Sequence, residues 1–316
     1  MNPSLGISII FLTHFMARTS DFDWKTWAMK KKGEFLTCLE VLTKSSEFLG
    51  RKGVPSPKCD SEWIVSSILK TKRMNLYLYP DEIIGEEKLN EIRSMIVRRG
   101  KREPLQHILG SVNFAGLVLK CDGRALIPRP ETETLVEHIL HRLPPSFDKA
   151  ILDIGTGTGA ILAALCSSLP SSVGVGLDQS EEALSLAKEN LKDLNLQSRT
   201  QVRKLDWNLQ KVSEEGVGLV VSNPPYLKTE EWECAETEVK AHDPKIALVA
   251  GEDGFSELKK IIDISVAVLP SGGMFALEFG TSHAEKISKS LSSKFESIEI
   301  LKDLSHYRRF SIARKC

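Results

Sequence analysis

The chain has 316 residues, with 42 basic and 42 acidic side chains, so its formal net charge is zero. This balance gives no electrostatic reason to expect direct binding to free DNA or RNA, which depends on positive side chains that contact phosphates. The six cysteines lack the spacing of a zinc site, which favours reduced thiols and no metal. No stretch reaches the roughly 20 apolar residues of a membrane-spanning helix. We therefore expect a cytoplasmic protein, with an organelle matrix as the alternative.

Residues 1–33 include an apolar run, Leu5–Phe15, that is interrupted by Ser8, Thr13 and His14. No positive region precedes the run and no clean cleavage site follows it, so it is unlike a secretion signal. We predict that residues 1–33 form a poorly ordered N-terminal extension.

Residues 34–104 are predicted to form a small helical domain. Apolar residues recur at helical spacing in three segments, which are Phe35–Leu49, Trp63–Leu69 and Glu86–Arg99. Glycine and proline follow the first of them, as expected at a helix end. Packing three such segments buries their apolar sides in one core.

Residues 105–130 change in character and are predicted to form a β-hairpin linker. Three glycines punctuate the segment, and apolar residues alternate in 117–119 and 125–127. Ile127-Pro128-Arg129-Pro130 then makes a stiff extended exit, because each proline restricts the residue before it. A helix is expected to follow at Glu131–Leu143.

Residues 131–316 are predicted to form an α/β domain in which strands and helices alternate. Such units build a mostly parallel sheet with helices on both faces. The last two strands have no helix between them, so we expect an antiparallel hairpin at one edge. The seven expected strands are Ala150–Ile154, Val173–Leu177, Thr200–Leu205, Val217–Ser222, Met274–Phe279, Ser297–Leu301 and Phe310–Ala313.

Three features at successive strand ends suggest a ligand site. Leu152–Gly159 holds three glycines at alternate positions after the first strand, which allows a tight turn and a close ligand approach. The spacing is not the Gly-x-Gly-x-x-Gly of dinucleotide binders. Asp178 ends the next strand, where a carboxylate can accept both hydroxyls of a ribose. Asp206 and Trp207 end the third, where they can meet an amino group and a flat base.

The fourth strand runs into Asn223-Pro224-Pro225-Tyr226. Asn223 offers a neutral carbonyl oxygen, and Pro224 offers a carbonyl without an N–H. Together they can present two acceptors to a planar NH₂ group, while Tyr226 packs on its face. A rigid turn is the simpler interpretation, but the corner falls at the sheet edge where open α/β proteins bind ligands.

These residues resemble the class I S-adenosylmethionine-dependent methyltransferases, which have a Rossmann-like, mostly parallel seven-stranded sheet. The resemblance narrows to the PrmC/HemK family and covers roughly residues 34–316. His242 departs from the family pattern. The matching segments, in order, are Glu103–Gly110, Leu126–Glu133, Asp153–Ile161, Asp206-Trp207, Ser222–Tyr226 and the loop from Asp243 to Gly254.

The resemblance implies an enzyme that methylates the glutamine side-chain amide in the Gly-Gly-Gln motif of class I peptide-chain release factors. It implies S-adenosylmethionine as cofactor, bound by Gly155, Thr156, Gly157, Thr158, Gly159, Asp178, Asp206, Trp207 and Asn223. The catalytic and substrate-binding residues would be Asn223, Pro224, Pro225 and Tyr226. Arg129, Glu131 and Thr132 either line the site or act as hinge residues. We expect a monomer.

Three other functions are consistent with part of the pattern. An adenine amino-group methyltransferase acting on DNA or RNA would use the same corner, but a basic face would be expected. A nicotinamide-dependent oxidoreductase would leave the corner unexplained. A non-catalytic binding module would not need every expected site residue.

Overall fold

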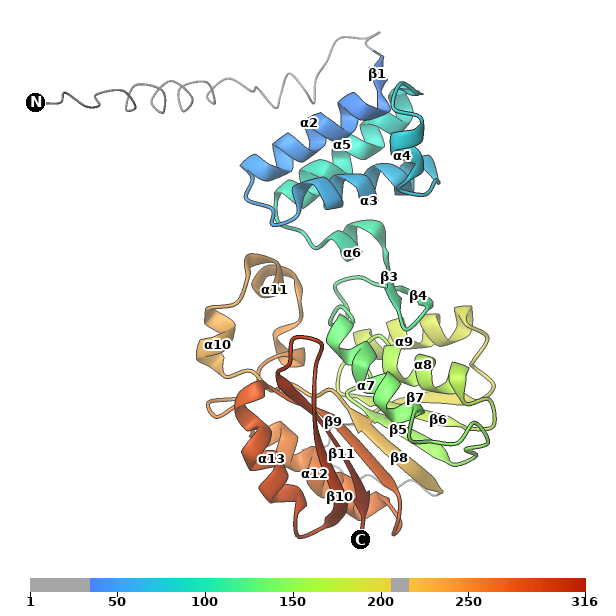
Figure 1. Cartoon of the computed structure of the whole chain (residues 1–316), viewed down its shortest axis with the longest axis vertical. Coiled ribbons are helices and arrows are strands. Elements are labelled where there is room, and N and C mark those ends of the chain that lie inside the picture. The colour runs from blue at the N-terminus through green and yellow to red at the C-terminus, as the bar shows by residue number, and fades with distance from the viewer. Residues whose placement is uncertain (1–34, 206–215) are drawn as a thin grey trace, which may run out of the picture. The chain divides into compact units, whose positions relative to one another are not determined.

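The computed structural model describes residues 35–205 and 216–316, and Figure 1 shows their helices and strands. The chain forms two compact units, and the boundary between them lies between Lys101 and Arg102. The predicted N-terminal extension, and the site residues Asp206 and Trp207, lie outside the described residues.

The N-terminal unit is built on three mutually packed helices, α2 (Cys38–Arg51), α3 (Pro57–Leu69) and α5 (Glu86–Gly100), with a short α4 (Asn75–Leu78). An ion pair joins α5 to α3, with 2.6 Å between Arg99 Nε and Asp60 Oδ2. Both side chains are buried, and a buried ion pair is weak evidence of added stability, because taking two charges out of water is costly. The predicted helical domain is confirmed as a fold.

The first helix begins later than the expected Phe35. Leu36–Thr37 forms a short strand, β1, that pairs antiparallel with β2 (Ile83–Ile84). Thr37 then caps α2, because its side chain accepts a bond from the Glu40 amide while the Glu40 carboxylate accepts from the Thr37 amide. This reciprocal cap sets the start of the helix, which periodicity alone does not locate.

The second unit opens with a short helix, α6 (Leu105–Leu109), followed by a hairpin of β3 (Ser111–Phe114) and β4 (Leu117–Lys120). Ala115 and Gly116 both have positive φ, as a two-residue hairpin turn of matching twist requires. The hairpin is shorter than the predicted 105–130 segment. Ala125–Ile127 alternates like a strand but pairs with no other strand of the described residues and runs as irregular chain.

The second unit is centred on one seven-stranded sheet of order β10-β11-β9-β8-β5-β6-β7. Five neighbouring strands are parallel, and β11 and β10 are antiparallel additions at one edge, as predicted. The strands are β5 (Ala150–Ile154), β6 (Gly174–Asp178), β7 (Thr200–Lys204), β8 (Val217–Ser222), β9 (Met274–Glu278), β10 (Phe295–Lys302) and β11 (Arg308–Lys315).

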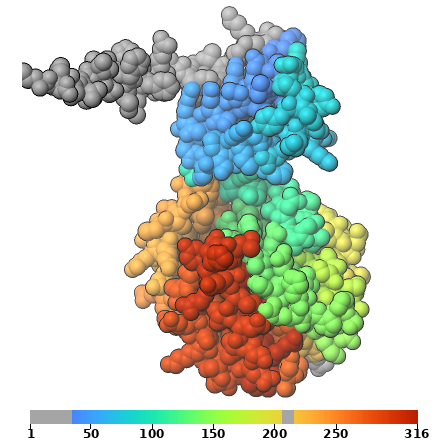
Figure 2. Space-filling view, in the orientation of Figure 1, coloured from blue at the N-terminus to red at the C-terminus, as the bar shows by residue number. Residues whose placement is uncertain are grey.

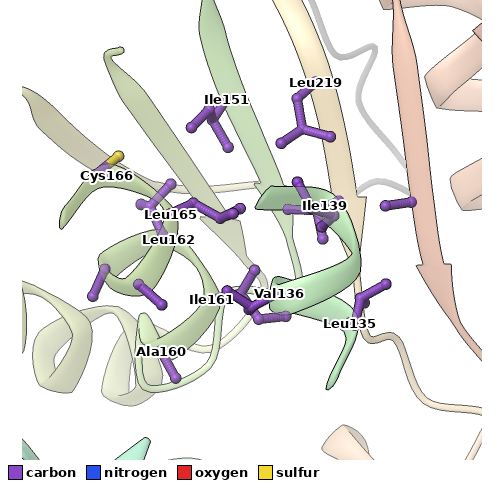
Figure 3. Close-up of a cluster of buried hydrophobic side chains, with 14 of the residues drawn as sticks. Leu135, Val136, Ile139, Ile151, Ala160, Ile161, Leu162, Leu165, Cys166 and Leu219 are labelled. Atoms are coloured by element: carbon purple, nitrogen blue, oxygen red, sulfur yellow. The ribbon is translucent and has the colours of Figure 1, made fainter. Parts of the chain in front are cut away.

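Two hydrophobic clusters cover the two faces of this sheet. One gathers α7 (Pro130–Leu140), α8 (Ala160–Ser168) and α9 (Glu181–Asp193) against the strands, as Figure 3 shows for its central part. The other holds α12 (Ser256–Val268) and α13 (Ala284–Leu291). Helix α8 is apolar on nearly every side because it is enclosed by the sheet, α7 and α9.

An ion pair joins the antiparallel edge of the sheet to the residues that follow α7. Arg142, just beyond α7, donates from Nε and Nη2 to the Glu299 carboxylate of β10 at 2.9 and 2.8 Å. In Figure 2 the late strands, in red, lie beside the green segment that contains α7. Such a two-bond contact between arginine and carboxylate is geometrically specific.

The segment between β8 and α12 contains short helices that were not predicted from the sequence. They are α10 (Thr229–Glu233), α11 (Thr237–His242) and the 3₁₀ helix η1 (Lys245–Ala247). A further 3₁₀ turn, η2 (Thr281–His283), precedes α13. In the part of the chain that the structure describes, no helix is long and apolar enough to cross a membrane.

Candidate active site

The site lies where the strand order reverses. β5 pairs with β6 on one side and with β8 on the other, so the loops that leave β5 and β8 diverge at their carboxyl ends. A cavity of about 230 Å³ opens there. It is lined by Phe114, Arg124–Arg129, Thr132, Gly155–Thr158, Ala160, Ile161, Asp178–Ser180, Ala183, Asn223, Pro225, Pro244, Ile246, Ala247, Val249 and Glu257.

The glycine loop that follows β5 forms one wall of the cavity. Gly155, Gly157 and Gly159 all have positive φ, between 54° and 79°. A Cβ on Gly159 would also lie 3.2 Å from the Cβ of Ala187 on α9. The loop is anchored to β6, because the amides of Gly155 and Thr156 both donate to the Leu177 carbonyl, at 2.8 and 2.9 Å. Only glycine allows this turn to pack so closely.

Asp178 ends β6 and faces the loop. Its Oδ2 accepts from the Gly157 amide at 2.9 Å, and its Oδ1 accepts from the Ser180 amide at 2.9 Å. Burial raises the pKa of Asp178, and the backbone donors oppose the rise. Each oxygen has a second lone pair, so the carboxylate can accept a pair of ligand hydroxyls as well.

A second carboxylate, Asp153 of β5, supports the loop from beneath. It is completely buried, and its Oδ2 accepts from the Thr156 hydroxyl at 2.7 Å. Burial raises the pKa of Asp153 to about 7, and the negative charge of Asp178 adds to the rise. Sequence reasoning did not single out Asp153, because nothing in a buried strand marks which polar residue meets a loop.

The hairpin is joined to the same loop by Asn190 of α9. Its Oδ1 accepts from the Lys120 amide at 2.7 Å, and its Nδ2 donates to the carbonyls of Lys120 and Thr158 at 3.2 and 2.9 Å. Asn190 is only 1% exposed. One amide side chain therefore fixes β4 against the cavity wall, another role that the sequence did not reveal.

The Asn223-Pro224-Pro225-Tyr226 corner leaves β8 at the opposite wall. The strand end is held by Ser222, whose hydroxyl donates to the Ile154 carbonyl at 2.6 Å. Asn223 and Pro225 line the cavity, whereas Pro224 is buried and is not part of the lining. Beyond the corner, the Leu227 amide donates to the Leu248 carbonyl at 2.9 Å, which returns the chain over the site.

Behind the corner lies a chain of hydrogen bonds. Asn223 Nδ2 donates to the Thr132 hydroxyl at 3.1 Å, and Thr132 donates to Glu278 Oε2 at 2.7 Å. The Tyr226 hydroxyl lies 3.4 Å from Glu278 Oε1. Burial raises the pKa of Glu278 to about 7, opposed by the Thr132 bond and by the positive Arg309. Burial and Glu278 raise the pKa of Tyr226 too, so that hydroxyl stays protonated.

The cavity has a roof formed by residues 244–249, which belong to the loop that resembles the family pattern but were not predicted to line the site. An ion pair secures it, with 2.6 Å between Arg129 Nη2 and Asp243 Oδ2. The Asp243 side chain is 2% exposed, and burial raises its pKa while Arg129 opposes the rise. The sequence offered one clue, since both segments carry charged residues next to proline.

The expected site residues do not all face the cavity. Gly155–Thr158, Asp178, Asn223, Pro225, Arg129 and Thr132 line it. Glu131 is exposed on α7, and neither Pro224 nor Tyr226 belongs to the lining; Tyr226 instead turns toward Glu278. Gly159 caps α8 behind the loop. Within residues 35–205 and 216–316, no cluster of His, Cys, Asp and Glu is arranged to hold a metal ion.

The composition of the cavity fits an adenosyl group with a short polar tail. Its walls are mostly apolar, with Ile127, Ile161 and Ala183 beside the carboxylate of Asp178, the last residue of β6. Apolar walls suit a flat base, and one carboxylate suits a ribose diol. A seven-stranded sheet with this strand order and a glycine loop at its switch point defines a class I S-adenosylmethionine-dependent methyltransferase.

Comparisons with known proteins narrow the class. The PrmC N-terminal domain family matches residues 40–110, and the methyltransferase small domain family matches residues 130–238. A solved hMettl16 catalytic domain, in complex with a MAT2A 3′UTR hairpin, covers 74% of this chain and 84% of its own, with 15% identity and a TM-score of 0.50. At that identity the likeness concerns the fold alone.

Curated relatives cover most of the chain. A release factor glutamine methyltransferase of Fusobacterium nucleatum is 38% identical, over 88% of this chain and 78% of its own. One from Deinococcus radiodurans is 37% identical, over 87% of this chain and 98% of its own. One from Caulobacter vibrioides is 31% identical, over 89% of this chain and 97% of its own. The chain belongs to the release factor glutamine methyltransferase family.

Proposed function

We propose that this chain transfers a methyl group from S-adenosylmethionine to the side-chain amide nitrogen of the glutamine in the Gly-Gly-Gln motif of peptide-chain release factors. Membership of the family supports the substrate class. The observation that carries the proposal is the Asn223-Pro224-Pro225-Tyr226 corner, which leaves β8 at the wall of the cavity. Its pair of acceptors suits a planar NH₂ group.

The chemistry explains why two acceptors are needed. An amide nitrogen is a poor nucleophile, because its lone pair is delocalised into the carbonyl. We propose that Asn223 and the Pro224 carbonyl accept its two hydrogens and so orient the nitrogen. As the nitrogen becomes more positive, these two oxygens stabilise it more strongly than in the ground state. Holding the reacting atoms in line supplies much of the remaining acceleration.

S-adenosylmethionine supplies an electrophilic methyl group on a sulfonium when it is bound. We assign its ribose to Asp178 and its remaining contacts to the loop of Gly155–Gly159, with Asp206 and Trp207 at the adenine. We propose that the roof of residues 244–249 limits the access of water to the site, which would favour a step that consumes charge. No side chain of the described lining is needed as a base, because the proton can leave after transfer.

The helical domain and the β3–β4 hairpin are proposed to hold the release factor while its glutamine enters the site. We propose a monomer that does not bind free nucleic acid, in keeping with the zero formal charge. We propose a location in the cytoplasm, which the bacterial relatives support, with an organelle matrix as the alternative.

The test is a methyl-transfer assay with labelled S-adenosylmethionine. The acceptors would be a release factor, the same factor with its Gly-Gly-Gln glutamine changed to alanine, and mixed nucleic acid. We expect label only on the intact factor, loss of transfer in Asn223→Ala, and normal transfer in Gln197→Ala. Gln197 is an exposed residue ahead of β7, at the other end of the strands, and serves as the control. Label on nucleic acid would overturn the proposal in favour of an adenine methyltransferase.

A further inference from the structure

Glu278 is a buried carboxylate with no part in the reaction as proposed so far. It is the last residue of β9, the strand next to β8, and only 2% exposed. Its two oxygens face the two ends of the corner. Oε2 accepts from Thr132, which in turn accepts from Asn223, and Oε1 lies near the Tyr226 hydroxyl. A buried carboxylate is costly, so its place behind the corner calls for an explanation.

The direction of these hydrogen bonds follows from the number of protons available. An ionised carboxylate only accepts, so Thr132 must give its single hydroxyl proton to Glu278. The Thr132 oxygen can then only accept from Asn223, which turns Nδ2 of Asn223 toward it. Oδ1 is left on the side away from Thr132, available to a ligand in the cavity that Asn223 lines.

The opposite orientation would disable the corner. A flipped Asn223 would offer its NH₂ group to the substrate NH₂, so that two donors would face each other. The shape of an asparagine amide is nearly symmetrical, and packing alone hardly distinguishes the two orientations. The distinction has to come from a neighbour whose hydrogen-bonding role is fixed.

We propose that Glu278 is a positioning residue that acts through Thr132 to hold Asn223 with its carbonyl oxygen toward the substrate amide. This inference rests on the role proposed for Asn223. It also gives a purpose to Thr132 in the Ile-Pro-Arg-Pro-Glu-Thr-Glu segment, since Thr132 is buried and joins α7 both to Asn223, which follows β8, and to β9.

Protonation of Glu278 should remove this constraint on the orientation of the Asn223 side chain. The charged and titratable groups that act on Glu278 are Arg309 of β11, Glu131 of α7 and Tyr226. Burial dominates and holds the pKa of Glu278 at about 7. Below that pH the carboxyl can donate to Thr132, whose own proton is then free to draw the Asn223 oxygen away from the substrate. The turnover rate should therefore fall as the pH drops through about 7.

The decisive comparison is Thr132→Val against Thr132→Ser. Valine keeps the shape and loses the hydroxyl, whereas serine keeps the hydroxyl and loses the methyl group. We expect kcat to fall roughly 10- to 100-fold in Thr132→Val, less than for loss of a direct transition-state contact. Thr132→Ser should retain most of kcat, and the affinity for S-adenosylmethionine, measured by calorimetry, should be unchanged in both.

Glu278→Gln provides the second arm, with exposed Glu296→Gln of β10 as its matched control. We expect Glu278→Gln to lower kcat and to abolish its fall below pH about 7, while the control keeps the wild-type profile. If Thr132→Val and Glu278→Gln turn over normally while Asn223→Ala is inactive, the inference fails and the proposed site stands. If Asn223→Ala is also fully active, the proposed site itself is wrong. If Thr132→Ser has a lower kcat than Thr132→Val, Thr132 acts by packing alone and the inference is wrong.

Discussion

Replacing Asp153 by asparagine is expected to make the protein more stable at high pH and less stable at low pH. Asp153 is completely buried, and burial next to Asp178 raises its pKa from 3.8 to about 7. Between these two values the folded protein holds a proton that the unfolded chain has released, so wild-type stability falls as the pH rises. From pH 5 to pH 8, the free energy of unfolding of the wild type should fall by about 2.5 kcal/mol on this account.

Asparagine carries no charge at any pH and therefore avoids that loss. It keeps the bond from Thr156, but its Nδ2 takes the place of Oδ1, which has no hydrogen-bond partner among the described residues. An unpaired buried donor costs about 1–3 kcal/mol at every pH. Between pH 5 and pH 8, the free energy of unfolding of the variant should therefore rise by about 2.5 kcal/mol relative to that of the wild type. The variant should be the less stable protein at pH 5 and the more stable one at pH 8.

Urea unfolding followed by circular dichroism at pH 5, 6, 7 and 8 measures this difference directly. Asp148→Asn, an exposed change just before β5, is the matched control and should track the wild type. A stability difference between Asp153→Asn and wild type that stays constant with pH would refute the reasoning, because it would mean that Asp153 titrates alike in the folded and unfolded chains.

Three further changes have expected outcomes. Gly159→Ala should lower the free energy of unfolding by about 1–2 kcal/mol, because φ is +79° there and Ala187 lies 3.2 Å from the added Cβ; thermal denaturation measures it. Asn190→Leu should cost about 1–3 kcal/mol and weaken S-adenosylmethionine binding in calorimetry, because it frees the glycine loop from β4. Arg129→Met should lower the free energy of unfolding in urea by about 2 kcal/mol, which is less than the loss expected for a fully buried pair. The double variant Arg129→Met with Asp243→Asn should recover part of this loss, because it no longer leaves a buried charge unpaired.

The sheet was largely predictable because its signals are local. Short apolar runs mark the strands, the missing helix before Phe310 predicts the antiparallel edge, and glycines mark the loop after β5. The ends of elements were less predictable. The α2 start depends on the cap between Thr37 and Glu40, and residues 125–127 alternate like a strand without pairing with another strand of the described residues.

The contacts between the supporting residues of the site could not be found from the sequence, for a physical reason. Thr132 and Glu278 meet across 146 positions of the chain, and Lys120 meets Asn190 across 70. A polar residue in a buried element looks the same in sequence whether it holds a loop or only fills space. Such contacts are decided by how helices pack on the sheet, which the local pattern does not encode.

The position of β11 also bears on how the protein is made. It is the last strand of the sheet in sequence, yet it lies inside the sheet between β9 and β10. On the ribosome, the helical unit can fold while the rest is still being added, since domains generally fold as units in order of synthesis. β9, which carries Glu278, has no partner on its outer side until residues 308–315 emerge. We therefore expect the outer edge of β9 to stay unpaired during synthesis until β11 is made. The hydrogen bonds between Glu278, Thr132 and Asn223 would then reach their final arrangement only after β11 has paired with β9.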